Sequence, residues 1–165
     1  MINRELIDPK SIVVVGGSNN VHKPGGRLVR NLLDGKYKGE LYVVNAREDD
    51  VQGLKSYHSV QDIPDTEMAI ISIPGPSCPE AVDILAKQKN VKAFIVVSAG
   101  FGEETHEGAI LENQMLDLSL IRSRLRFQFR RYGAFHHRIG IDKRLAFLLC
   151  MVGWQLQADW GRGGD

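Results

Sequence analysis

The chain has 165 residues, of which 43% are hydrophobic and 25% charged, the composition of one globular domain with a sizeable core. It contains no run of about 18 apolar residues, which argues against a membrane span. The opening residues, MINRELIDPK, lack the apolar region of a secretory signal, so we expect a cytoplasmic protein. Cys78 and Cys150 lie far apart without a CxxC pattern or a histidine at metal spacing, which argues against a zinc site or a disulfide framework.

The charges divide the chain near residue 117. Residues 1–116 carry 12 Lys+Arg and 16 Asp+Glu, whereas residues 117–165 carry 9 and 4. The second part has 8 Arg and 1 Lys, no glutamate and both tryptophans. We therefore expect one domain over 1–116 and an atypical Arg-rich tail over 117–165.

Short, continuous apolar runs alternate with amphipathic stretches along the first part. The apolar runs Ser11–Val15, Glu40–Val44, 68–73 and 93–97 predict buried parallel strands. Apolar stripes over 26–33, 79–89 and 105–118 predict helices, with Ser77 a candidate N-cap, and 54–66 reads as a connection with one short strand. The alternation predicts an α/β class: a Rossmann-like, mostly parallel sheet with helices on both faces.

Ligands of such sheets bind at the carboxyl ends of the strands, so the residues after each strand are the candidates. The first strand is followed by a long polar loop rich in glycine, with Gly16, Gly17, Ser18, Asn19, Lys23 and Gly25. Small residues let the backbone approach a phosphate, and the next helix adds free N–H groups and a partial positive charge. The alternative is a strand-to-helix turn without a ligand.

The second strand is followed by Asn45, Ala46 and Arg47. NAD enzymes have an acidic residue there for the ribose hydroxyls, and the GxGxxG spacing is also absent. An arginine suits a phosphate on the adenosine ribose, which both NADP and coenzyme A (CoA) possess. A solvated surface charge is the alternative for Arg47.

The third and fourth strands also end in candidate ligand contacts. Ile73 and Pro74 form either an apolar wall or a rigid stop, and Ser98, Ala99, Gly100 and Phe101 form a glycine-containing turn. Cys78 and the histidines have no catalytic partner visible in the sequence, so no catalytic residue is predicted.

The ordered set of these motifs resembles a known family. Asp8-Pro9-Lys10-Ser11, IVVVGGSNN, GGRLVRNLL, GKYKGELYVVNAR, LKSYHSVQDIPD, MAIISIP and FIVVSAGFGEE together resemble the CoA-binding domain of the NDP-forming acyl-CoA synthetases, relatives of the succinyl-CoA synthetase α-subunit. The resemblance covers roughly residues 5–116.

The resemblance implies roles for the candidate residues. Gly16 to Asn19, Lys23 and Gly25 would bind the CoA phosphates, and Arg47 would meet the phosphorylated ribose. Ile73-Pro74 and the turn of Ser98 to Gly102 would line the adenine and pantetheine channel. Gly17 where alanine is usual, Ala46 where proline is common and Arg47 for lysine are departures from the family pattern.

The tail departs further, because it lacks the strand, the GPN-type turn and the phosphorylated histidine that the family resemblance implies. We interpret 117–165 as an out-of-frame translation or a fusion scar, and expect the sheet edge beyond 93–97 to lack a fifth strand. A genuine helix pair is the alternative, and a nucleic-acid site is a weaker one.

These observations lead to one main expectation. We expect a CoA-binding domain of an acyl-CoA ligase that binds CoA or acyl-CoA without turnover, ATP and ADP being used only in the complete enzyme with an ATP-grasp subunit or domain. Whether the chain alone is an enzyme stays open. The alternatives are a standalone regulatory CoA-binding protein and an NADP-linked oxidoreductase.

Overall fold

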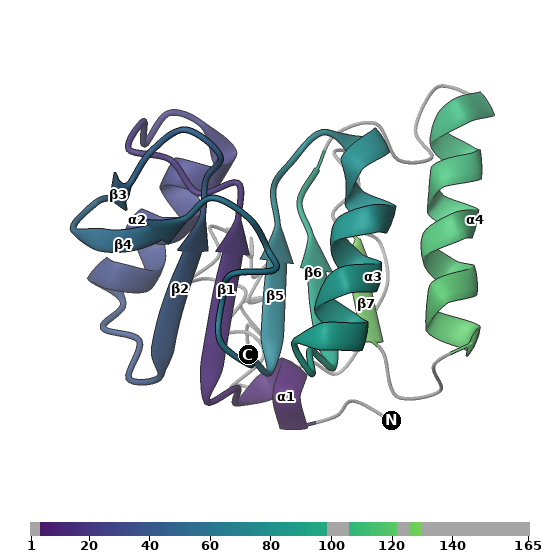
Figure 1. Ribbon diagram of the computed structural model, residues 1–165, viewed down its shortest axis with the longest axis horizontal. Coiled ribbons are helices and arrows are strands. Elements are labelled where there is room, and N and C mark those ends of the chain that lie inside the picture. The colour runs from purple at the N-terminus through teal and green to yellow at the C-terminus, as the bar shows by residue number, and fades with distance from the viewer. Residues whose placement is uncertain (1–3, 99–105, 122–125, 130–165) are drawn as a thin grey trace, which may run out of the picture.

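The computed structural model describes residues 4–98, 106–121 and 126–129. At its centre lies a seven-stranded sheet of order β3-β4-β2-β1-β5-β6-β7 (Figure 1). Among the strands of the described residues, only β3 and β4 pair antiparallel. The strands are β1 (Ser11–Val15), β2 (Glu40–Val44), β3 (Asp50–Val51), β4 (Leu54–Tyr57), β5 (Met68–Ile71), β6 (Ala93–Val96) and β7 (Arg126–Phe129). The predicted α/β class and mostly parallel sheet are confirmed.

Burial on both faces explains why the central strands are continuously apolar. Every residue of β1, β5 and β6 is buried, and β1 pairs with β2 on one side and β5 on the other. The predicted bounds of β1 and β2 agree with the structure. The predicted strand 68–73 ends earlier, at Ile71, because Ser72 and Ile73 already belong to the loop above the sheet.

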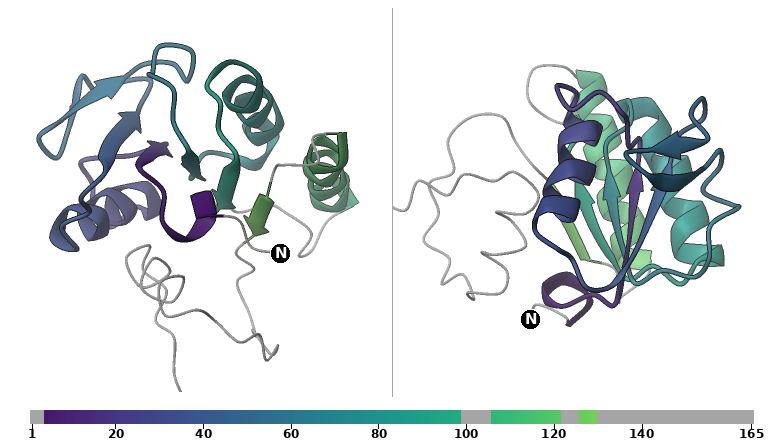
Figure 2. Two further views of the ribbon diagram at one scale, coloured as in Figure 1. Left: turned by 90° about the horizontal axis from the view of Figure 1, so that it is seen from below. Right: turned by 90° about the vertical axis from the view of Figure 1, so that its left-hand side faces the viewer.

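Helices cover the two faces of the sheet (Figure 2). On one face, α2 (Pro24–Asp34) packs Leu28, Val29 and Leu32 against the even-numbered side chains of β1 and β5. On the other, α3 (Cys78–Gln88) packs Val82 and Leu85 against the odd-numbered ones, and α4 (His106–Ile121) lies beside α3. The short α1 (Arg4–Ile7) lies at the amino ends of the strands, and η1 (Gly75–Ser77) precedes α3.

Some expected details differ from the structure. Ser77 occupies the N-cap position of α3 but its side chain makes no capping hydrogen bond. The helix predicted over 105–118 continues to Ile121, across the expected boundary at 117. Among the described residues, no helix is long and apolar enough to cross a membrane.

The expectation of a missing fifth strand is wrong. Strand β7 pairs in parallel with β6, with Ala93 opposite Arg126 and Val96 opposite Phe129. The sequence Arg-Phe-Gln-Phe alternates polar and aromatic residues with the period of a strand. The helix-pair alternative is therefore also wrong over 126–129; residues 130–165 lie outside the described ones.

Candidate functional site

A cleft of about 590 Å³ lies where β1, β2, β4 and β5 end. This is the edge of a parallel sheet at which ligands bind, and the volume is typical of small-molecule sites. Four chain segments line it: Val15, Gly16, Gly17, Ser18 and Lys23; Val44 to Glu48; His58 to Gln61; and Ser72, Ile73, Pro74, Ser77, Glu80, Ala81 and Ile84.

The β1–α2 loop (residues 16–23) passes very close to its neighbours, which explains its glycines. Gly16 has φ +88°, and a Cβ there would lie 2.3 Å from the Ser72 carbonyl oxygen. Gly25 is buried in the first turn of α2, where a Cβ would lie 1.9 Å from the Gly16 carbonyl oxygen. The start of α2 is therefore packed directly against the loop, as a phosphate-binding turn requires.

The amino end of α2 gives this side of the cleft a positive potential. The helix begins at Pro24, whose missing N–H costs nothing at this position, and the following N–H groups have no partner within the helix. The exposed Lys23 adds a full charge beside them. The partial charge of the helix end and the ammonium group together favour an anion.

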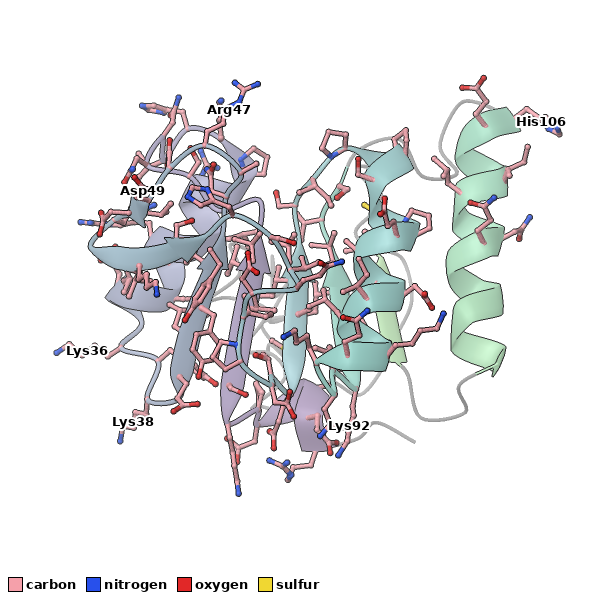
Figure 3. The ribbon with its side chains drawn as sticks, in the orientation of Figure 1. Lys36, Lys38, Arg47, Asp49, Lys92 and His106 are labelled. Carbon is pink, nitrogen blue, oxygen red and sulfur yellow. The ribbon has the colours of Figure 1, made fainter. Side chains whose placement is uncertain are left out.

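Arg47 supplies the second basic group of the cleft. It follows β2 and extends beyond the carboxyl ends of the strands, whereas Lys36, Lys38 and Lys92 lie toward the opposite end of the sheet (Figure 3). The neighbouring Glu48 does not neutralise it directly. The Glu48 carboxylate accepts hydrogen bonds from the backbone N–H and the side-chain amide of Asn19, both at 3.1 Å.

Asn45 joins the loops after β1 and β2. Its Nδ2 donates to the Gly17 carbonyl at 2.7 Å, and its Oδ1 accepts from the N–H groups of Arg47 at 2.8 Å and Glu48 at 3.2 Å. The side chain lines the cleft, but these bonds already use both ends of its amide. Asn45 therefore shapes the two loops that carry the charged groups.

The other two segments bring apolar and polar residues to the cleft, the polar ones including Ser72, Ser77 and Glu80. Ile73 and Pro74 lie there with Ala81 and Ile84 of α3, and Val60 comes from the segment after β4. The residues from His58 to Gln61 are not among the predicted site residues, because the sequence of 54–66 predicts a connection. The signal that could have found them is the short strand expected in that segment, because a parallel strand beside β2 must end at the same edge.

The structure brings eight of the predicted site residues to the cleft: Gly16, Gly17, Ser18, Lys23, Asn45, Arg47, Ile73 and Pro74. Asn19 and Gly25 are not in its lining and instead support the β1–α2 loop. Ser98 is buried and donates to the Ile71 carbonyl at 3.4 Å. Ala99, Gly100 and Phe101 lie outside the described residues.

Comparison with known proteins decides the family. The CoA binding domain family matches residues 10–119, about two thirds of the chain. The chain belongs to the CoA-binding domain family. The match runs past residue 116 to residue 119, so it includes all but the last two residues of α4.

Relatives of this CoA-binding domain are parts of much longer ligases. An ADP-forming acetate–CoA ligase II of Archaeoglobus fulgidus is 42% identical over 117 residues, which cover 70% of this chain and 17% of the ligase. The α-subunit of the ADP-forming acetate–CoA ligase II of Pyrococcus furiosus is 36% identical over 116 residues, 69% of this chain and 25% of the subunit. The chain therefore spans a quarter or less of these relatives.

A solved structure agrees with this relationship. The dinucleotide forming acetyl-coenzyme A synthetase 1 of Ca. Korarchaeum cryptofilum, in complex with phosphate and ADP, superposes with a TM-score of 0.66 at 32% identity. The match covers 75% of this chain and 26% of the synthetase. The predicted Rossmann-like CoA-binding fold is confirmed.

The nucleophile and base candidates of the CoA-binding domain do not form a catalytic pair in the described part of the chain. Cys78 is buried, and burial raises the pKa of its thiol, an effect that the hydrogen bond between the thiol and the Ser98 hydroxyl oxygen offsets in part. His58 Nε2 lies 2.8 Å from Asp49 Oδ1, but the Asp49 side chain is 94% exposed, so the pair is a weak surface contact. The described residues contain no cluster suited to a metal ion.

Proposed function

We propose that the cleft binds coenzyme A through the residues predicted from the sequence. The diphosphate lies against Gly16, Gly17 and Ser18, with the amino end of α2 and Lys23 supplying positive charge. The phosphorylated ribose meets Arg47. The observation that carries the proposal is that the anion-binding loop and an arginine lie on one side of a single cleft, at the strand ends where this family's ligand is expected.

The apolar residues of the cleft account for the rest of the ligand. Ile73, Val60 and Ile84 offer a flat, donor-poor surface for the adenine ring or the pantetheine arm. Ser98 to Phe101 remain candidates for the far end of this channel.

The Arg47 assignment is tested by the phosphate that distinguishes two ligands. CoA carries a phosphate on its ribose and dephospho-CoA does not, so isothermal titration should show tighter binding of CoA. In Arg47→Met the advantage should fall by about tenfold or more, the value of a charge-assisted hydrogen bond. Arg30→Met is the matched control, because Arg30 is exposed on α2 and pairs with Asp34.

Two results would contradict the assignment. Equal affinity of the wild type for CoA and dephospho-CoA would remove Arg47 from its role. Tighter binding of NADP than of CoA would favour the oxidoreductase alternative over the CoA site.

We further propose that this domain serves an ADP-forming acyl-CoA ligase, in which it presents CoA to a nucleotide-binding (ATP-grasp) subunit or domain. The relatives that support this are ligases and ligase α-subunits of that class. The chain alone should form no acetyl-CoA from acetate, ATP and CoA. Formation of acetyl-CoA by the purified chain would overturn the proposal that the chain alone binds CoA without catalysing the reaction.

The tail remains a separate proposal. We expect residues beyond about 117 to derive from a shifted reading frame. Sequencing the coding DNA tests this: a GPN-type turn that returns on shifting the frame supports it, and an intact frame that encodes the tail overturns it.

A further inference from the structure

The β3–β4 hairpin contacts the β1–α2 loop from outside the cleft. Asp50 pairs with Lys55 and Val51 with Leu54, so Gln52 and Gly53 form a two-residue turn. Their φ angles are +54° and +85°, the left-handed values of a type I′ turn. Glutamine seldom adopts this conformation, so the position calls for an explanation.

The side chain of Gln52 explains this conformation, because it joins the β1–α2 loop to α2. Its Nε2 donates to the Ser18 carbonyl at 2.9 Å and to the Gly26 carbonyl at 2.8 Å. Its backbone N–H donates to Asn19 Oδ1 at 2.7 Å. Gln52 therefore holds the β1–α2 loop against the first turn of α2 by three hydrogen bonds.

The chemistry of the amide fits this use. Both acceptors are carbonyls, so the group that serves them must carry two N–H donors, which a primary amide does. The Gln52 Oε1 atom is buried without a hydrogen-bond partner among the described residues. The fold thus tolerates one unsatisfied acceptor while it keeps both donor bonds.

These bonds also orient the loop electrostatically. The carbonyl oxygen of Ser18 would repel a phosphate if it faced the cleft. It accepts instead from Gln52, which is not among the residues that line the cleft. The side chain therefore acts on a bound anion through the loop and not by contact.

Arg47, the second basic group of the cleft, lies in the segment between β2 and this hairpin. Arg47 precedes Glu48, whose carboxylate binds Asn19, and the Asn19 amide also donates to the Asp50 carbonyl at 2.8 Å. Gln52 thus completes a hydrogen-bonded contact between the segment of Arg47 and the β1–α2 loop.

We propose that Gln52 is a positioning residue that holds the β1–α2 loop in its anion-binding shape. The inference rests on the proposed CoA function. Because the loop faces the diphosphate, which CoA and dephospho-CoA share, Gln52 should affect both ligands equally.

The test compares variants by isothermal titration with both ligands and by thermal melting. Gln52→Met keeps the length of the side chain and removes both donors. Gln52→Asn favours the same positive φ but is too short to reach both carbonyls. Gln88→Met is the matched control, the same change at an exposed position near the end of α3.

Both Gln52 variants should bind CoA and dephospho-CoA about tenfold more weakly, with the preference between the two ligands and the binding stoichiometry unchanged. Gln88→Met should bind like the wild type. A purely structural role would lower the melting temperature or the stoichiometry and leave the dissociation constant of the folded protein unchanged, which would overturn the inference. If Gln52→Met does not fold, Gln52→Asn decides by the same criteria.

The outcomes separate the two proposals. If the wild type binds CoA and the Gln52 variants bind it equally well, the positioning role alone is overturned. A wild type that binds no CoA would overturn the proposed function, and this inference with it.

Discussion

The two sides of the cleft are held in shape by different means. The β1–α2 loop depends on side-chain amides from other segments, Asn45 and Gln52, which bind its carbonyls. The opposite side, residues 72–77, is held by backbone hydrogen bonds, such as Ser77 N–H to the Pro74 carbonyl at 3.0 Å, and by prolines that fix φ. Single side-chain substitutions should therefore change the conformation of the β1–α2 loop, whereas they should change that of residues 72–77 much less.

The largest expected effect comes from Gly25→Ala, because the new Cβ would lie 1.9 Å from the backbone oxygen of Gly16. The backbones of Gly16 and Gly25 can move apart only if the β1–α2 loop or α2 shifts. We expect a loss of about 3 kcal/mol in the free energy of unfolding, at the upper end for overpacking, together with loss of CoA binding. Urea unfolding and isothermal titration measure the two effects.

Gly53→Ala is the control for this change. Gly53 has φ +85° but no atom within 4 Å of a new Cβ, so the substitution adds only backbone strain of about 1–2 kcal/mol. CoA binding should persist. Equal losses in the two variants would show that close packing of the loop against α2 is not what matters.

The next effect should come from Asn45→Ala, which removes the hydrogen bond to the Gly17 carbonyl in the β1–α2 loop and two hydrogen bonds within the loop after β2. We expect a loss of about 2 kcal/mol in stability and a roughly tenfold weaker affinity for CoA. Asn45→Asp separates the contributions, since it keeps the acceptor for Arg47 and Glu48 but sets a carboxylate against the Gly17 carbonyl. An aspartate variant with wild-type affinity would show that the bond to Gly17 is dispensable.

On the other side of the cleft, Pro74→Ala should do little. Alanine can adopt the φ of −54° found at Pro74, so the main change is greater freedom of the unfolded chain. We expect a loss of about 0.4–1 kcal/mol in stability and an affinity for CoA within about twofold of the wild type. An affinity loss larger than that of Asn45→Ala would reverse the contrast between the two sides.

The smallest effect should come from Glu67→Gln, at the end of the sheet opposite the cleft. A hydrogen bond from Arg4, at 2.7 Å, lowers the pKa of Glu67 from its ordinary value of 4.5. The folded state therefore gains stability above the ordinary pKa and loses it as the pH falls toward the lowered one. The variant should be less affected by acid below about pH 4.5, lose less stability at pH 7 than Pro74→Ala, and bind CoA normally. Urea unfolding across pH checks this, and a steeper acid loss would contradict it.

The sheet was predictable because its signal is local. Strands β1 and β2 were predicted to the residue, since both faces of β1 are buried and four of its five residues are β-branched. Strand β7 was not, because the change in composition near 117 outweighed the two-residue period of Arg126–Phe129.

The site was predictable only in part. Gly16, Gly17 and Arg47 follow strands within three residues, so topology alone brings them to one edge, and Lys23 precedes the helix that starts there. Gln52 was missed because its bonds join residues far apart in sequence, and because Gln-Gly lacks the Asn-Gly or Asp-Gly signature of a tight hairpin. Asn19 and Gly25 were predicted as ligand contacts, but a sequence cannot distinguish a residue that touches a ligand from one that supports the loop beside it.

The tight turn at Gln52 and Gly53 has a consequence for the order of folding. A hairpin closed by two residues can form within about 1–10 μs, whereas β1 must wait for β5, a distant part of the chain. During synthesis, the carbonyls of Ser18 and Gly26 stay without their partner until Gln52 has emerged. We therefore expect pulse-labelled amides of the hairpin to gain protection before those that join β1 to β5, so that the support for the β1–α2 loop exists before the cleft closes over it.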